Sequence, residues 1–239
     1  NKKASEVRVL NEKLKDAYEE LETFSSTISH DLRTPLAVIK NYAQLLERNK
    51  TLNDDGKKFA ARINVGVERM NRLITEVLEY SRVGRSEIKF DPVDMTQLLD
   101  TIKHELMIAL NPSDLILEIN GTPPIAGDRT MLYQVFLNLI NNAIKYSRLS
   151  KPSRVKVTGI ENNYEVVYTI EDNGIGISEE HFGKVFELFK RVNVSEDFEG
   201  TGVGLAIVKR ILDKHKAKVW IESKVNVGTT FFLSFRKMN

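Results

Sequence analysis

"SHDLRTPL", residues 29–36, interrupts a series of apolar residues with helical spacing. Over 7–28 the apolar positions recur at alternating steps of three and four, the heptad pattern of a helix that packs on a helical partner. The alternation resumes over 36–46, a polar loop follows at 49–55, and a second apolar series covers 59–80. This pattern predicts a helical hairpin. Because one hairpin would leave much apolar surface exposed, we expect two chains to pair into a four-helix bundle.

The quoted stretch itself carries groups suited to chemistry. Its apolar steps become four, four and four, so the heptad slips and His30 points away from the apolar seam. Asp31 flanks His30, Thr34 lies one turn further on the same face, and Pro35 loosens the turn. An exposed imidazole beside a carboxylate suits proton or phosphoryl transfer near neutral pH. A surface histidine at a Thr-Pro kink is the alternative, and this stretch alone leaves both readings open.

The bulk composition limits the class of protein. The chain has 239 residues, 41% hydrophobic and 28% charged, as is typical of a globular protein with a core. A net charge of +2 gives no sign of a nucleic-acid or membrane-surface binder. The absence of cysteine excludes disulfides, zinc–thiolate sites and thiol catalysis, and is compatible with a reducing cytoplasm. The chain begins with Asn inside a helical pattern, so we expect it to be a fragment.

The hydrophobic pattern of the sequence changes near 84–92, after which predicted helices alternate with predicted strands. Asp94 and Gln97 resemble a capping box at the start of the first helix of this second region. Helices are predicted at 94–106, 130–147, 179–189 and 203–215, and strands at 115–120, 154–161, 164–171, 218–223 and 229–235. The sequence therefore predicts two domains: an all-α hairpin over 1–85, with an N-terminal coiled coil, and an α/β two-layer domain over 86–239.

Three polar side chains share one face of the helix predicted at 130–147. In "NLINNAIKYS" (138–147), Asn138, Asn142 and Lys145 stand at i, i+4 and i+7, opposite the apolar positions. Two amides and an ammonium in this arrangement can hold a hydrated magnesium ion and phosphate oxygens. A solvated polar face is the alternative.

Two glycine-rich stretches follow. In "EDNGIG" (171–176), Asp172 ends a predicted strand, where its carboxylate could accept a hydrogen bond from an exocyclic amine. "GTGVGL" (200–205) opens a helix, and backbone amides at a helix start form an anion site. Its spacing matches neither a dinucleotide fingerprint nor a Walker loop. The polar segment between the two stretches is predicted to be a mobile lid.

In their order along the chain, these motifs resemble the catalytic core of a sensor histidine kinase of two-component signalling. The resemblance covers nearly the whole chain: "SHDLRTPL" is similar to the H box, "NLINNAIKYS" to the N box, "EDNGIG" and "GTGVGLAI" to the two glycine boxes, "FELFKR" to the F box, and "VGTTFFLSF" to the terminal strand. The lid and the second glycine box are most similar to the phytochrome-type subgroup. The resemblance implies a dimeric four-helix bundle and an ATP-binding sandwich of the type shared with chaperone and topoisomerase ATPases.

The resemblance also implies the roles of individual residues. His30 is the expected phosphoacceptor, Asp31 its acid/base partner, and Thr34 matches the position linked to phosphatase activity. The expected cofactors are ATP and Mg²⁺. Asn142, assisted by Asn138, is assigned to magnesium, and Lys145 and Arg191 are assigned to the phosphates. Tyr146 would form the pocket wall, Asp172 would bind the adenine amine with Thr230 acting through water, and Gly174 and Gly176 would allow close approach to the backbone. The lid hinge and the phosphate cradle are assigned to the second glycine-rich stretch: Gly200, Thr201, Gly202, Gly204 and Leu205.

The implied activity is that of an ATP-dependent protein histidine kinase. It would autophosphorylate His30 and pass the phosphoryl group to an aspartate on the receiver domain of a response regulator. The implied partners are a second copy through the hairpin and an upstream sensor domain, with no nucleic acid and no direct membrane contact by this fragment. We expect a cytoplasmic location, and membrane tethering of the whole protein stays open. So do regulator phosphatase activity and the choice between transfer within one chain and transfer between two.

Two other classes are carried as alternatives. One is a non-catalytic dimeric scaffold with a vestigial nucleotide pocket, and the other is an ATPase of the chaperone or topoisomerase type. The sequence also departs from the family pattern after the last helix, where Lys216 and Ala217 replace a glycine pair. His215 is expected to be a favourable surface or capping cation at that helix end, and Trp220 a core residue that faces a helix.

Overall fold

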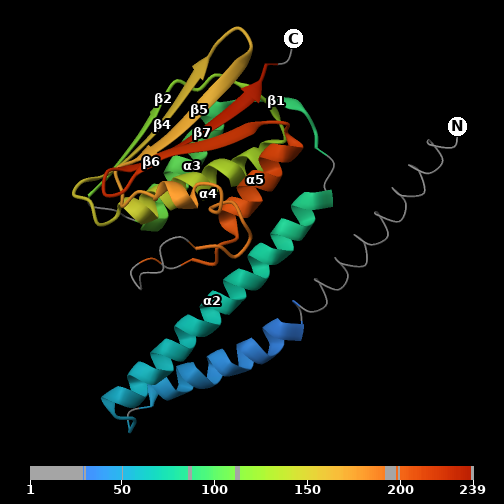
Figure 1. Cartoon of the computed structure of the whole chain (residues 1–239). Helices are drawn as coiled ribbons and strands as arrows, with labels where there is room; N and C mark the ends of the chain where they lie inside the picture. The colour runs from blue at the N-terminus through green and yellow to red at the C-terminus, as the bar shows by residue number, and fades with distance from the viewer. Residues whose placement is uncertain are drawn as a thin grey trace, which may run out of the picture. The chain divides into compact units, whose positions relative to one another are not determined.

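The chain divides into two compact units, Asn1–Arg85 and Ser86–Asn239 (Figure 1). The computed structural model describes residues 29, 31–49, 51–85, 88–110, 114–191, 198 and 200–237. His30, the predicted coiled coil over 7–28, and residues 192–197 and 199 of the predicted lid therefore lie outside the described residues. In this described part, no helix is both long enough and apolar enough to cross a membrane.

The first unit contains the predicted helical hairpin. A helix over 31–48 is followed by a short connection and then by α2, Asp54–Arg85. The side-chain oxygen of Asn53 accepts a hydrogen bond from the backbone N–H of Gly56 at 2.9 Å, which caps the start of α2. Asp54 and Asp55 occupy its first turn, where negative charge interacts favourably with the positive end of the helix dipole.

Small and branched side chains bring the two hairpin helices together. Ala43 and Ala60 are 2% and 1% exposed, and Leu36 and Val67 are also buried. A hydrogen-bonded ion pair joins Lys40 to Glu68 across the hairpin. Other apolar residues of both helices remain exposed: Leu32, Ile39, Leu46, Phe59, Ile63 and Met70. A single hairpin thus leaves an apolar surface uncovered.

The second unit is built on a mixed five-stranded sheet in the order β2-β4-β5-β7-β6. The strands are β2 Leu115–Asn120, β4 Ser153–Glu161, β5 Glu165–Asp172, β6 Lys218–Lys224 and β7 Gly228–Arg236. β2 and β4 are parallel, and the remaining pairs are antiparallel. The predicted strand hairpin over 154–171 is confirmed as β4 and β5. A small two-stranded sheet, β1 Asp91–Val93 with β3 Ile125–Gly127, was not predicted from the sequence.

Three helices cover one face of the sheet: α3 Met95–Leu110, α4 Arg129–Ser147 and α5 Gly204–Lys214 (Figure 1). Alternate residues of β5 are buried against them, and the other face of the sheet is open. Side chains with almost no exposure come from the helices and from β5: Leu98, Leu99, Ile102, Leu132, Phe136, Leu139, Ile207, Ile211, Tyr168 and Ile170. The predicted two-layer α/β sandwich is therefore confirmed.

Side-chain caps position the helices that carry the site. The Asp94 carboxylate accepts a hydrogen bond from the backbone N–H of Gln97 at 3.0 Å, close to the predicted capping box. Asp128 caps α4 by accepting bonds from the backbone N–H groups of Thr130 and Met131, both at 3.0 Å. The start of α4 is thereby fixed close to its predicted place.

The prediction of a helix at 179–189 is wrong. Only a single 3₁₀ turn, η1 Glu179–His181, forms there, and turns continue to Phe189, whose φ of 64° is left-handed. The backbone N–H of Phe189 donates to the carbonyl of Gly202 at 3.0 Å. This tertiary bond, far from Phe189 in sequence, overrides the helical propensity of the segment.

Trp220 is not a core residue. It is 40% exposed on the open face of the sheet, where its ring stacks on Phe232 with centroids 5.1 Å apart and planes 5° apart. The neighbouring Ile221 points inward instead and is 8% exposed. The alternation of the edge strand β6 decides this orientation.

The turn after α5 forms without the glycine pair. Lys216 adopts a left-handed φ of 54°, and the backbone N–H of Ala217 donates to the carbonyl of Leu212 at 2.9 Å, as in a Schellman motif. His215 caps the helix as expected but is buried and neutral. Its Nδ1–H donates to the carbonyl of Ile211 at 2.8 Å, its Nε2 accepts from the backbone N–H of Asp128 at 3.0 Å, and burial lowers its pKa.

Candidate functional site

The polar face predicted on α4 is present. Asn138, Asn142 and Lys145 are half-buried, and the opposite face of α4 packs Leu132 and Phe136 into the core. Within the described parts of the chain, neither the Asn138 nor the Asn142 side chain makes a hydrogen bond. Their amide oxygens are of the kind that Mg²⁺ accepts as ligands.

The second glycine-rich stretch meets this face. A Cβ added to Gly204 would lie 3.3 Å from Oδ1 of Asn138, and one added to Gly200 would lie 2.9 Å from Nζ of Lys145. α5 begins at Gly204, after Val203, without a side-chain cap. Because the first N–H groups of a helix have no partner inside it, those of α5 stand beside Asn138 as donors for an anion.

The remaining residues of that stretch shape the approach to α5. Gly202 has a left-handed φ of 78° and lies against the backbone of Phe189 and Lys190. The hydroxyl of Thr201 accepts a bond from the backbone N–H of Val203 at 3.4 Å, and Leu205 is half-buried in the first turn of α5. Residues 200–205 thus connect the segment near Phe189 to the helix start.

The first glycine-rich loop lies against the C-terminal part of α4. The backbone N–H of Ile175 donates to the carbonyl of Tyr146 at 3.3 Å, and a Cβ on Gly174 would lie 2.5 Å from that oxygen. Glycine is therefore required at 174 for the close approach. Gly176, with a φ of 67°, packs on the backbone of Lys224 and so supports the β6–β7 turn rather than the α4 face.

Asp172 is a buried carboxylate at the end of β5. Its side chain accepts hydrogen bonds from the backbone N–H groups of Gly174, at 2.8 Å, and Thr229. It is 8% exposed, and this burial outweighs both bonds and raises its pKa to about 6. A buried carboxylate that is ionised at neutral pH is a strong acceptor for an amine of a bound ligand.

The sheet register separates Thr230 from Asp172. Asp172 pairs with Thr229, which is 5% exposed on the same inner face, whereas Thr230 pairs with Glu171 and is half-buried on the open face. The Thr229 hydroxyl shares a 2.9 Å hydrogen bond with that of Ser223. Sequence reasoning missed Thr229, although counting strand alternation from Phe231 would have found it.

An aromatic pair closes another side of the α4 face. The Tyr146 ring lies 5.2 Å from the ring of Phe198, and Nζ of Lys145 stands 4.5 Å from the Tyr146 centroid and 3.2 Å from its hydroxyl. Arg191 donates to the carbonyl of Phe198 at 2.6 Å, and the Arg148 guanidinium lies 5.0 Å from the Phe198 ring. Phe198, only 3% exposed, was also missed from the sequence.

The structure thus brings α4, the Asp172 loop and the start of α5 together at one site. It combines a carboxylate, two amides, two cations and a helix N-terminus, and this chemistry suits a purine nucleotide. The H-box residues Asp31 and Thr34 are exposed on the helix over 31–48 in the other unit. No cluster of three or more His, Cys, Asp or Glu residues with metal-binding geometry occurs among the described residues.

Two family models match the chain. The "His Kinase A (phospho-acceptor) domain" matches residues 20–86, and the "Histidine kinase-, DNA gyrase B-, and HSP90-like ATPase" matches residues 127–239. The chain belongs to the sensor histidine kinase family. The family resemblance deduced from the sequence motifs is confirmed, and the chain carries the catalytic core of an ATP-dependent histidine kinase.

Relatives of this kinase core include a phytochrome-like protein and a sensor protein kinase. It is 33% identical over 235 residues to the phytochrome-like protein Cph1 of Synechocystis, covering 98% of this chain and 31% of the relative. It is 32% identical over 219 residues to the sensor protein kinase WalK of Staphylococcus haemolyticus, covering 88% and 36%. The chain therefore spans about a third of the length of these relatives. The phytochrome match fits the predicted subgroup.

Solved histidine kinases share the architecture. Full-length ShkA in complex with AMPPNP superposes with a TM-score of 0.67 at 25% identity, covering 90% of this chain and 46% of that one. The kinase ThkA in complex with the response regulator protein TrrA gives a TM-score of 0.64 at 22% identity, covering 90% and 61%. The second likeness concerns the fold alone.

Proposed function

We propose that this chain is the catalytic core of a sensor kinase that uses ATP to phosphorylate His30 and then phosphorylates a response regulator. Residues 86–239 would bind ATP, and residues 1–85 would form the dimer and carry the phosphoacceptor. The observation that supports this most directly is that Asn138 and Lys145 of α4 lie beside the glycine-rich stretch that begins α5, while the loop after Asp172 packs on the end of α4.

The site offers a partner for each part of ATP. The buried Asp172 carboxylate would accept a hydrogen bond from the adenine amine, and Thr229 beside it would complete that end of the pocket through water. Tyr146 would pack against the nucleotide. Lys145, Arg191 and the first N–H groups of α5 would hold the phosphates.

The half-buried amide groups of α4 suit a magnesium ion. Asn142, assisted by Asn138, would hold Mg²⁺, because both amides are half-buried without hydrogen bonds to other described residues. When bound, the ion would supply charge neutralisation at the phosphate oxygens.

Phosphoryl transfer would begin with an unprotonated nitrogen of the His30 ring. This nitrogen bonds to the γ-phosphorus while the bond from that phosphorus to the β–γ bridging oxygen breaks, and ADP leaves with the electron pair. Asp31 would take the proton from the other ring nitrogen. The protein would contribute mainly positioning and charge compensation, as in other phosphoryl transfers.

The partners follow from the same proposal. The exposed apolar surface of the hairpin supports a homodimer, and membership of the sensor histidine kinase family supports a receiver domain as the phosphoryl acceptor. Thr34, exposed on the helix over 31–48, would act in the reverse, hydrolytic direction by holding a water. The cytoplasm is the proposed location, and an upstream sensor domain would supply the signal.

Incubation with ATP labelled at the γ-phosphate tests this function. Wild type should gain an acid-labile, base-stable label, His30→Ala should gain none, and Asn142→Ala should lose at least about a hundredfold of the labelling rate. The matched control is Asn141→Ala, which changes the exposed neighbour of Asn142 and should label normally. Equal labelling of wild type and His30→Ala would refute the assignment of the phosphoacceptor.

Mixed dimers would then determine the direction of transfer. A dimer of one His30→Ala chain and one Asn142→Ala chain retains one intact acceptor and one intact nucleotide site, on different chains. Labelling of this heterodimer means that the phosphoryl group is transferred between chains. Absence of labelling means transfer within one chain, provided that the control dimers, in which each variant chain is paired with a wild-type chain, are labelled.

A further inference from the structure

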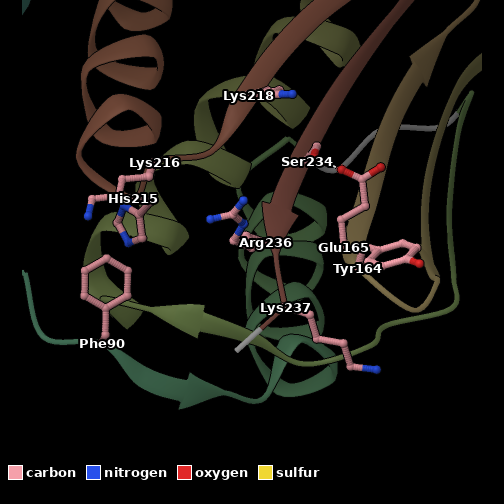
Figure 2. A pocket seen from close by; sticks show the side chains of 9 residues that line it. All are labelled: Phe90, Tyr164, Glu165, His215, Lys216, Lys218, Ser234, Arg236 and Lys237. Carbon is pink, nitrogen blue, oxygen red and sulfur yellow. Dashed lines mark hydrogen bonds between the residues drawn. The ribbon is translucent and has the colours of Figure 1, made fainter. Parts of the chain in front are cut away.

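A cavity lies at the opposite end of β5 from Asp172. It has a volume of about 570 Å³ and is lined by residues of β5, β6, β7, the turn after α5, and Phe90 (Figure 2). β5 extends from Glu165, which lines this cavity, to Asp172. At about 3.3 Å per strand residue, the two ends are on the order of 20 Å apart. The cavity is therefore separate from the proposed ATP site.

Three cationic side chains from three elements line this cavity. Lys216 follows α5, Lys218 begins β6, and Arg236 ends β7. In the sheet register Lys218 pairs with Ser234, so Arg236, two residues further along β7, is its diagonal neighbour on the same face. Side chains in this relation stand close enough for their charges to repel each other.

The cavity lining carries more cations than carboxylates, with Lys216, Lys218, Arg236 and Lys237 against Glu165 alone. Within the described residues, no ion pair or side-chain hydrogen bond involves Lys216, Lys218 or Arg236. Glu165 is directly opposite Arg236 in register, but its carboxylate accepts a hydrogen bond from the Ser234 hydroxyl instead. In Figure 2 the Arg236 guanidinium points away from that carboxylate, toward His215. An anion in the cavity would relieve this repulsion.

Two aromatic side chains stand on opposite sides of Arg236 (Figure 2). Phe90 is 45% exposed and meets the buried His215 edge-on, with ring centroids 5.7 Å apart. Tyr164 is 81% exposed on the β4–β5 turn. Exposed aromatic faces beside an arginine can stack on a planar ring, while the guanidinium binds phosphate oxygens in pairs.

We propose that this cavity binds a small phosphorylated ligand with a planar ring, of mononucleotide size, at a site distinct from that of ATP. Arg236, Lys218 and Lys216 bind the phosphate, and Tyr164 and Phe90 contact the ring. The volume lies within the range of small-molecule sites, about 300–1,000 Å³. This proposal does not depend on the kinase activity, because no residue of the Asp172 site contributes to the cavity.

Isothermal titration of the full chain with two probes tests the proposal. Inorganic pyrophosphate reports on the phosphate subsite alone, and guanosine monophosphate reports on phosphate and ring together. Both should bind, and both should bind about tenfold or more weakly to Lys218→Gln/Arg236→Gln, since each charge-assisted hydrogen bond contributes about 1.5–3 kcal/mol. The matched control is Arg154→Gln/Lys156→Gln, which removes the same charges from exposed positions of β4 and should bind both probes normally.

Further variants separate the ring from the phosphate and this site from the ATP site. Tyr164→Ala should weaken guanosine monophosphate binding several-fold and leave pyrophosphate binding unchanged. Asp172→Asn should leave the binding of both probes unchanged. The proposal is overturned if wild type binds neither probe, or if the Lys218→Gln/Arg236→Gln variant binds them as the β4 control does. Equal binding of both probes by wild type and Tyr164→Ala would overturn the planar-ring requirement.

Discussion

The two units of the chain differ in how far they bury their apolar side chains. In the α/β unit, Leu98, Leu132 and Ile211 have no measurable exposure within one chain. In the hairpin, Phe59 is 62% exposed, and Ile63 and Met70 are above 40%. Burial of apolar area is the main stabilising contribution to folding. The α/β unit thus contains its own core, whereas the hairpin needs a second surface to complete one.

Removing a core side chain should have the largest effect on the α/β unit. Leu139→Ala truncates a fully buried residue of α4, and we expect it to lower the free energy of unfolding of that unit by about 2–5 kcal/mol. Leu149→Ala, at a 60% exposed position just after α4, should change it by less than about 0.5 kcal/mol. Chemical denaturation followed by Trp220 fluorescence measures both, and equal losses would contradict the assignment of the core.

A charge placed on the exposed face of the hairpin should act on association instead. Ile63→Asp would bury a carboxylate in the expected dimer interface, and we expect the dimer to weaken by about 2–4 kcal/mol. Ile160→Asp, on the open face of the sheet and 65% exposed, should leave the dimer intact. Analytical ultracentrifugation distinguishes the two. A monomeric wild type would show that the hairpin core is completed in another way.

The Asp172 carboxylate should lower the stability of the α/β unit at neutral pH. Its pKa is raised from 3.8 to about 6, so folding favours the protonated form. The cost is absent below about pH 4, grows as pH rises to about 6, and is then on the order of 2–3 kcal/mol. Asp172→Asn should therefore raise thermal stability at pH 7, with little effect at pH 4.

The same pKa should control nucleotide affinity. The ionised carboxylate is the acceptor for adenine, so the affinity for ATP should fall up to about tenfold for each pH unit below 6. Asp172→Asn should bind more weakly at pH 7 and lose this dependence. Titration calorimetry between pH 5 and pH 8 checks both, and a flat wild-type profile would contradict the role of Asp172.

The smallest expected effect concerns the turn after α5. Lys216 holds a left-handed conformation that glycine adopts without steric cost, so Lys216→Gly should stabilise the α/β unit by about 1 kcal/mol. The hairpin should melt unchanged. Thermal unfolding of both units measures this, and a loss of stability would show that the Lys216 side chain contributes more than its backbone strain costs.

The sequence predicted those elements whose hydrophobic pattern and caps agree. α4 begins after its cap Asp128, and Asn138 and Asn142 lie on its polar face as predicted. This helix contacts both predicted glycine-rich stretches. The strand hairpin over 154–171 was predicted for the same reason. The family match had the same basis, since short motifs in a fixed order survive where overall identity is low.

The errors occurred where contacts distant in sequence decide the outcome. The segment 179–189 has helical composition, but a bond from Phe189 to Gly202 holds it in turns. Thr229 and Thr230 are the same residue type, so composition does not separate them, and the pairing of β5 with β7 places Thr229 opposite Asp172. Phe198 belongs to the site through its ring contact with Tyr146, which no local pattern reveals.

The bond between His215 and Asp128 has a consequence for how the nucleotide site can move. It ties the end of α5 to the beginning of α4, while Gly204 at the other end of α5 lies beside Asn138. The two helices are thus joined by a hydrogen bond at one end and lie side by side at the other. Binding of a nucleotide beside Gly204 would therefore leave the hydrophobic interior between the two helices undisturbed.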